Sequence, residues 1–233
     1  WNGDAAAPAI EEPAGYDFKT PLWSPGYTGI KAPTTCVAQM EKETYTVTFA
    51  DQNGNTITTE QVKYQDDITT TAADINALLP DGERTATPAW DASAGQDVTG
   101  NTTVTVNLEY RVTFDLNGAT QTAGDTTNLT QWVAWNGDAA APAIEEPTGY
   151  DFKTPLWSPG YTGVKAPMTC VAQMEKETYT VTFSDQNGNM ITTEQVKYQD
   201  DITTTAADIN ALLPDGERTA TPAWDASAGQ DVT

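Results

Sequence analysis

Histidine is absent from this 233-residue chain, cysteine occurs twice, and only 11 basic residues accompany 33 acidic ones. Because histidine is the commonest general base and transition-metal ligand, its absence argues against most acid–base catalysis and metal chemistry. The formal charge of −22 repels nucleic acid and anionic membranes. No apolar run approaches the roughly 18 residues of a membrane-spanning helix, and no signal peptide is recognisable. We therefore expect no enzyme, no cofactor, no nucleic-acid partner and no membrane insertion.

A long repeat organises the chain. Residues 1–99 match residues 135–233 at all but five positions. The five differences are Ala14/Thr148, Ile30/Val164, Thr34/Met168, Ala50/Ser184 and Thr56/Met190. Copies this alike indicate a recent duplication and a function that depends on the number of units.

A shorter period lies inside the long one. The segment GYDFKTPLW (15–23 and 149–157) aligns with GERTATPAW (82–90), and TTVTVNLE (102–109) aligns with MTCVAQME (168–175). Each long unit is therefore two diverged modules. These are a partial module A at 1–43, module B at 44–109, module A at 110–177 and a partial module B at 178–233. The abrupt start at Trp1 and the incomplete end modules suggest an excerpt from a longer array.

The spacing of apolar residues predicts the secondary structure of module B. Tyr45–Phe49 and Thr56–Val62 alternate on either side of an Asn-Gly turn, which is typical of a β-hairpin. Residues 71–79 place apolar side chains at helical intervals, and Pro80 and Gly82 then end the predicted helix.

The ends of the modules are predicted strands. Val104, Val106 and Leu108 lie on one face of the closing strand of module B. In module A, residues 131–135 predict a strand and residues 137–142 a turn or short helix. The class that follows is α+β, with one small sheet covering a single helix in each module.

Cys36 and Cys170 are the same position in the two long repeats, so they supply no disulfide framework. The alignment places Cys170 over Val104, on the inward face of the closing strand. A buried cysteine behaves as a small hydrophobe, which favours core packing. A thiol that links neighbouring chains is the alternative.

Module A carries a resemblance to a known family. The order YRVTF, an Asn-Gly turn, GDAAAPAIEEPTGYDF, a tryptophan and MTCVAQME resembles the internalin-type B repeat (the Listeria–Bacteroides repeat) of bacterial surface proteins. The match is good across module A and thinner across module B, and Thr-Pro-Leu-Trp157 replaces the usual Gly-Trp step. The resemblance implies tandem β-grasp-like modules and a role in extracellular stalks. It implies no catalytic residues.

The module boundaries contain no flexible linker. Glu109 runs directly into Tyr110, and only Lys176-Glu177-Thr178 precede Tyr179, without a run of Gly, Ser or Pro. If entry and exit lie at opposite ends, as the resemblance implies, the modules stack head to tail in an elongated rod.

Two acidic turns are weak calcium candidates because of their oxygen-rich side chains. They comprise Asp51, Asn53 and Asn55 in the first copy and Asp185, Asn187 and Asn189 in the second. Both lack the bidentate glutamate and the flanking helices of a complete calcium loop. A plain hairpin turn is therefore the favoured interpretation, and we expect no metal site.

Aromatic residues of module A form the other candidate site. Trp132, Trp135 and Tyr161 could stack on a glycan, with Tyr150, Phe152 and Trp157 nearby. A module this small also needs its large side chains for its core, which is the favoured interpretation. Burial of Trp90 and Trp157 would favour packing, whereas an exposed patch of the first three residues would favour binding.

The remaining candidates carry less weight. The paired carboxylates Glu145 and Glu146 have no nucleophile placed near them, so acid–base catalysis is not expected. Asn101 and Asn128 match the short glycosylation pattern. A Lys–Asn or Lys–Asp isopeptide cross-link would suit a stalk, but the sequence does not identify one.

These observations favour a structural spacer or stalk segment of a repetitive bacterial cell-surface adhesin or extracellular fibre. Its partners would be neighbouring repeats of the same chain, with other copies in a fibre as a further partner. Two alternatives stay open. One is a repeated binding module that engages a glycan or host protein by avidity. The other is a filament subunit completed by strand donation.

Overall fold

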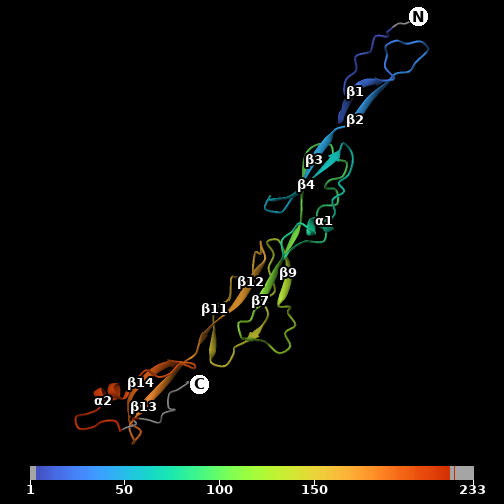
Figure 1. Ribbon diagram of the computed structural model, residues 1–233. Coiled ribbons are helices and arrows are strands. Elements are labelled where there is room, and N and C mark those ends of the chain that lie inside the picture. The colour runs from blue at the N-terminus through green and yellow to red at the C-terminus, as the bar shows by residue number, and fades with distance from the viewer. Residues whose placement is uncertain (1–3, 221–222, 224–233) are drawn as a thin grey trace. The chain divides into compact units, whose positions relative to one another are not determined.

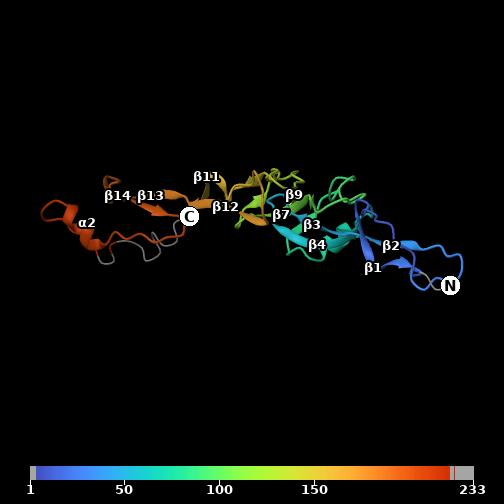
Figure 2. The same ribbon diagram turned by 90° about the horizontal axis from the view of Figure 1, so that it is seen from above.

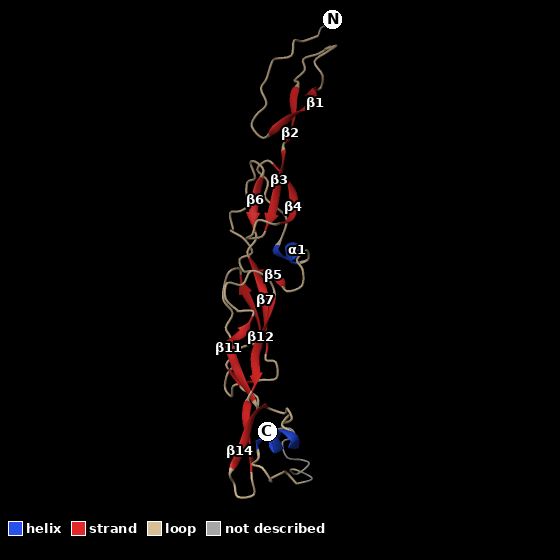
Figure 3. Ribbon diagram, turned by 90° about the vertical axis from the view of Figure 1, so that its left-hand side faces the viewer, coloured by secondary structure: helices blue, strands red, loops and turns tan. Residues whose placement is uncertain are grey.

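The computed structural model describes residues 4–220 and 223. Of these residues, 41% are in strands and 6% in helices, and Figure 3 shows the predominance of strands. The strands form several small sheets. The predicted α+β class of tandem β-grasp-like modules stacked in an elongated rod is therefore wrong, and the fold is mostly β. The predicted partial modules at 1–43 and 178–233 lie in part outside the described residues.

The chain divides into two compact units. The first comprises Trp1–Arg111, Trp132–Asp138 and Gly163–Pro167. Its elements are β1 (Tyr16–Ser24), β2 (Val37–Lys42), β3 (Thr44–Ala50), β4 (Thr56–Lys63), α1 (Ala72–Asn76), β5 (Glu83–Thr85) and β6 (Thr102–Thr105). Strands β1 and β2 form an antiparallel pair (Figures 1 and 2), and β4, β3 and β6 form a three-stranded sheet in that order (Figure 3).

The second unit comprises Val112–Gln131, Ala139–Thr162 and Met168–Thr233. Its elements are β8 (Thr120–Gln121), β10 (Ile144–Glu145), β11 (Tyr150–Ser158), β12 (Met168–Lys176), β13 (Thr178–Ser184), β14 (Met190–Lys197) and α2 (Ala206–Leu212). Strands β7 (Leu108–Asp115) and β9 (Thr130–Ala134) each contribute residues to both units.

The predicted hairpin of module B is confirmed. Strands β3 and β4 pair antiparallel, with Val47 opposite Glu60 and a register shift between Phe49 and Ala50. Strands β13 and β14 repeat this pairing, including the shift, in the second copy. The turn forms because Gly54 and Gly188, with φ of +86° and +82°, supply the positive φ that this hairpin turn requires.

Both complete modules contain the same parallel strand pair. In module B, β3 pairs with β6 and places Phe49 opposite Val104. In module A, β7 pairs with β12 and places Phe114 opposite Cys170. The identical register supports the internal alignment of the two modules.

The core of each module lies beneath this pair. In module B the buried side chains include Val47, Phe49 and Val104, and in module A they include Phe114 and Cys170. Cys170 is fully buried, which confirms its predicted place in the core. Burial raises the pKa of its thiol, so this cysteine is a poor nucleophile.

The helical segments are shorter than predicted. Helix α1 begins after Thr71, whose hydroxyl accepts a hydrogen bond from the Asp74 backbone in a capping box, and it ends at Asn76. Residues 137–142 form no helix. There the Gln131 side chain bridges the backbone of Ala140, with Nε2 donating to the carbonyl at 2.6 Å and Oε1 accepting from the amide at 2.9 Å. These two bonds imitate strand pairing and hold the segment extended.

Candidate functional site: the joints between modules

A single type of backbone hydrogen bond recurs at all three joints between modules. In each joint, a residue at the module boundary or just after it donates its N–H to the carbonyl of a glycine in the module that precedes the boundary. The bonds run from Glu43 to Gly15 at 2.9 Å, from Arg111 to Gly82 at 2.8 Å, and from Glu177 to Gly149 at 2.9 Å. The three glycines are the first residues of the aligned segments GYDFKTPLW and GERTATPAW.

Each joint glycine also lies against a ring from the neighbouring module. Gly15 and Gly149 both have φ near +77°, in the left-handed region that favours glycine. A Cβ at these positions would overlap the rings of Tyr64 and Tyr198, respectively. Gly82 has φ +87° and lies against the ring of Pro167. Glycine is therefore required twice over, by its backbone conformation and by the ring that packs on it.

The joint from module A to module B occurs once in each compact unit. In the second unit, the Tyr198 ring lies edge-on to Tyr150 with centroids 5.8 Å apart. The Tyr198 amide donates to the Glu177 carbonyl at 2.9 Å, and Lys176 forms an ion pair with Asp200 at 2.6 Å. The hydrogen bond to Asp200 raises the pKa of Lys176.

The first unit repeats these contacts residue by residue. The Tyr64 ring lies edge-on to Tyr16 with centroids 5.8 Å apart, and the Tyr64 amide donates to the Glu43 carbonyl at 2.9 Å. Lys42 forms the equivalent ion pair with Asp66 at 2.6 Å. The joint is thus built from local contacts that two copies of the sequence reproduce.

The joint from module B to module A uses different side chains. Arg111 forms two hydrogen bonds with the Asp81 carboxylate, at 3.1 and 2.6 Å. Arg84 lies over the Trp132 ring, 4.4 Å from its centroid, and also pairs with Glu109 at 2.7 Å. Here β5 adds to β7, with Glu83 opposite Tyr110.

The predicted aromatic site residues are distributed between the two units. Trp132 is 37% exposed, but Arg84 covers one face of its ring. Trp135 is half-buried, donates from Nε1 to the Asn53 side chain at 3.3 Å, and has Lys165 5.7 Å from its ring centroid. Both tryptophans therefore belong to the joint after module B. Tyr161 lies in the second unit, half-buried against Phe114 at 5.9 Å.

The tryptophans of the aligned segments pack inward. Trp157 is 5% exposed and meets Phe114 edge-on at 4.9 Å. Trp90 is half-buried and meets Phe49 in the same way at 5.6 Å. This burial favours the packing interpretation, while glycan stacking by the remaining aromatic residues stays a prediction.

The calcium candidates cap hairpin turns. Asp51 accepts hydrogen bonds from the backbone amides of Asn53 and Asn55 and from the Asn55 side chain, each at 2.8 Å. Asp185 makes the same three bonds with Asn187 and Asn189, and the bond from the Asn189 side chain is the largest cause of its lowered pKa. The carboxylates are thus engaged by N–H donors, and calcium binding stays a prediction. Within the described ranges, no three Cys, Asp or Glu side chains group to hold a metal ion.

Other predicted candidates have structural contacts. Glu146 accepts from the Phe152 amide at 2.9 Å, so it holds the turn before β11. Asn101 accepts from the Thr46 amide at 2.8 Å, beside the start of β6. Cys36, the copy of Cys170, is half-buried.

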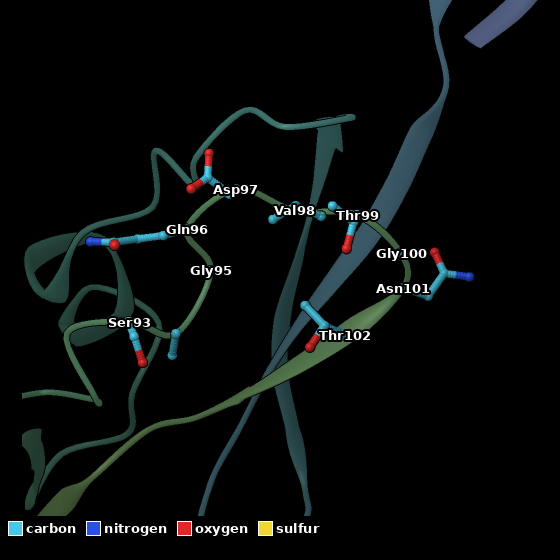
Figure 4. Close-up of a pocket in the computed structure, with 10 residues that line it drawn as sticks. Ser93, Gly95, Gln96, Asp97, Val98, Thr99, Gly100, Asn101 and Thr102 are labelled. Carbon is cyan, nitrogen blue, oxygen red and sulfur yellow. The ribbon is translucent and has the colours of Figure 1, made fainter. Parts of the chain in front are cut away.

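A cleft of about 390 Å³ lies over the loop from Ser93 to Thr102. Figure 4 shows the side chains of Gln96, Asp97 and Asn101 pointing in different directions rather than toward one another. The cleft therefore presents no converging set of groups that would bind a small molecule. No helix among the described residues has the length and apolar character to span a membrane.

Sequence reasoning missed the role of the joint glycines, although their recurrence at the start of each aligned segment was an available signal. Comparison with models of known protein families found no match, and comparison with curated proteins also found none.

Proposed function

We propose that the chain is a structural spacer segment of a repetitive bacterial surface protein or extracellular fibre. One observation carries this proposal: the joint from module A to module B is built twice by the same contacts, at Gly15 with Tyr64 and at Gly149 with Tyr198. A spacer needs a defined relation between successive modules, and side-chain contacts at each joint supply one.

The contacts at a joint act together to restrict bending. The bond from the Tyr198 amide to the Glu177 carbonyl, the Tyr198 ring packed on Gly149 and the ion pair of Lys176 with Asp200 all connect the two modules. A flexible Gly/Ser linker would make none of these contacts. Bending at the joint would have to break several of them at once, so its free-energy cost exceeds that of any single contact.

The acidic charge and the resemblance to internalin-type B repeats support the extracellular setting. With 33 acidic and 11 basic residues, copies of the chain repel one another at low salt, which keeps a crowded surface protein soluble. The B-repeat resemblance implies the bacterial cell surface as the location. Repetition of whole units then serves to set length rather than to multiply an active site.

The joint can be tested by measuring a distance distribution across it. Spin labels would be placed at Lys153→Cys in module A and Met190→Cys in module B, in a Cys36→Ser background. Met190 is 68% exposed, and the Lys153 side chain is 48% exposed, so both tolerate a label. We expect a narrow distribution that broadens strongly in Tyr198→Ala, because that change removes the ring from Gly149.

The matched control is Tyr161→Ala, which removes a half-buried ring from module A without touching the joint. It should leave the distribution narrow. A broad distribution in the unmodified joint would contradict the spacer proposal, since the modules would then move independently.

A further inference from the structure

The first and last strands of each complete module lie side by side and run in the same direction. In module B, residues 47–50 of β3 pair with residues 102–105 of β6. In module A, residues 112–115 of β7 pair with residues 168–171 of β12. Four consecutive residues are in register in each case, and no other strand lies between the two.

This arrangement determines how tension along the chain acts on the module. The chain enters at the start of the opening strand and leaves from the end of the closing strand. Because the strands are parallel, pulling on the chain draws them past each other along their own axes. The inter-strand hydrogen bonds, which are evenly spaced in a parallel pair, are then loaded together rather than one after another.

One face of each parallel pair is shielded from water. Val47, Phe49 and Val104 are at most 1% exposed beneath the pair in module B. Phe114 and Cys170 are at most 2% exposed beneath the pair in module A. Water therefore has little access to the bonds from this face, and sliding the strands would also expose its apolar surface.

The hairpin partner of the opening strand lies outside the path of force. Strand β4 follows β3 through a tight turn and is antiparallel to it. Tension between the ends of the module passes from β3 to β6, so the contacts of β4 with β3 carry none of it until those two strands have separated. Strand β3 thus bears the tension through its pairing with β6 and not through its pairing with β4, although both partner strands contain buried side chains.

We infer that the parallel pair of opening and closing strands is a mechanical clamp, which makes each complete module resist extension along the chain. The inference rests on the proposed spacer function only for the source of the tension. The clamp itself follows from strand order and direction.

The test is to stretch the full chain between its two ends and measure the rate of unfolding at constant force. Unfolding of residues 44–109 should lengthen the chain by roughly 220–240 Å, less the folded span, at about 3.3–3.6 Å per residue. Val104→Ala removes packing that must be broken before the two clamp strands can separate. We therefore expect residues 44–109 to unfold about ten-fold faster in this variant at the same force.

Val62→Ala supplies the matched control. Val62 is 3% exposed on β4 and Val104 is 1% exposed on β6, so the same truncation removes a similarly buried side chain. Both variants should lose comparable stability in urea. The unfolding rate under force should change less than about two-fold in Val62→Ala, because β3 and β4 remain paired as the clamp opens.

Equal acceleration in the two variants would overturn the clamp. A comparison of pulling points gives a second test. Pulling on Thr44 and Lys63, which lie opposite each other, unzips the hairpin of β3 and β4. The clamp would also be overturned if wild-type module B, pulled from its two ends, unfolded at no higher force than this hairpin. A narrow distance distribution across the joint together with either result would reject the clamp and leave the spacer proposal standing.

Discussion

At the scale of single residues, the joints depend on glycines whose replacement by any other residue would cost stability. Gly149 combines a φ of +77° with a tyrosine ring where its Cβ would lie. Gly188 has a similar φ of +82°, but nothing lies within 4 Å of its Cβ position. The two positions therefore separate the cost of the backbone conformation from the cost of displacing the ring.

We predict that Gly149→Ala lowers the free energy of unfolding by about 2–4 kcal/mol, from left-handed strain and ring displacement together. Gly188→Ala should cost about 1–2 kcal/mol, from the strain alone. Urea denaturation of the full chain measures both. Equal losses in the two variants would show that the Tyr198 ring adjusts without penalty and that the joint is not tightly packed.

At the scale of elements, a carboxylate connects β14 to the loop before α2. Glu194 accepts hydrogen bonds from the Thr203 hydroxyl and amide and from the Thr204 amide, at 2.5, 2.8 and 2.9 Å. These bonds, led by that of the Thr203 hydroxyl, lower the pKa of Glu194 from 4.5 to about 2. Because the folded pKa is lower than the unfolded one, the contribution to stability is fully present above about pH 4.5. It is lost as the pH falls toward 2.

We therefore predict that Glu194→Gln reduces the acid sensitivity of the last hairpin and helix. Wild-type protein should lose protection of the β14 amides between pH 4.5 and 2, and the variant should show a shallower change over that range because glutamine does not titrate. Hydrogen exchange at several pH values measures this. Glu145→Gln, at an exposed position in β10, is the control and should match wild type. A variant as acid-sensitive as wild type would mean that Glu194 does not hold the loop.

Local signals explain which elements the sequence predicted. The Asn-Gly turn between alternating segments identified the hairpin because turn and strand pattern act within about ten residues. The predicted start of the helix at Thr71 was right, but the predicted helix over residues 71–79 was too long. Leu78 has helical spacing, yet it lies after the end of the helix and is 57% exposed. Alanine-rich residues 137–142 predicted a turn or short helix, but the segment is extended because the Gln131 side chain hydrogen-bonds to the Ala140 backbone, a contact that no local pattern reveals.

Contacts between distant residues explain what the sequence did not predict. The pairing of β3 with β6 joins residues about 55 positions apart. The internal alignment showed that the closing strands of modules A and B correspond, but not that a closing strand lies beside the opening strand or runs parallel to it. Trp132 and Trp135 were candidates for a glycan surface because the sequence did not identify their partners. These partners, Arg84 and Asn53, lie in another module. Sequence spacing alone cannot bring such residues together.

At the scale of the whole molecule, charge is distributed unevenly. The net charge is −22, yet many of the scarce cations lie at the joints. Those with contacts there are Lys42, Arg84, Arg111, Lys165 and Lys176. Salt therefore acts in two opposite ways: it screens the repulsion among the acidic residues, and it weakens the joint ion pairs.

We predict that the first effect dominates, so that added NaCl stabilises the chain. Raising the salt from about 0.01 to about 1 M shortens the Debye length from about 30 to about 3 Å. Repulsion between acidic residues acts over distances within that range and is largely removed. The joint pair of Lys176 with Asp200, at 2.6 Å, lies inside even the shorter length, and as a partly exposed pair it contributes little at any salt. The midpoint of urea denaturation should rise with NaCl, urea being chosen because guanidinium is itself a salt. A falling midpoint would show that the joint ion pairs outweigh the repulsion of the whole chain, and the joints would then owe their strength to charge rather than to glycine and ring packing.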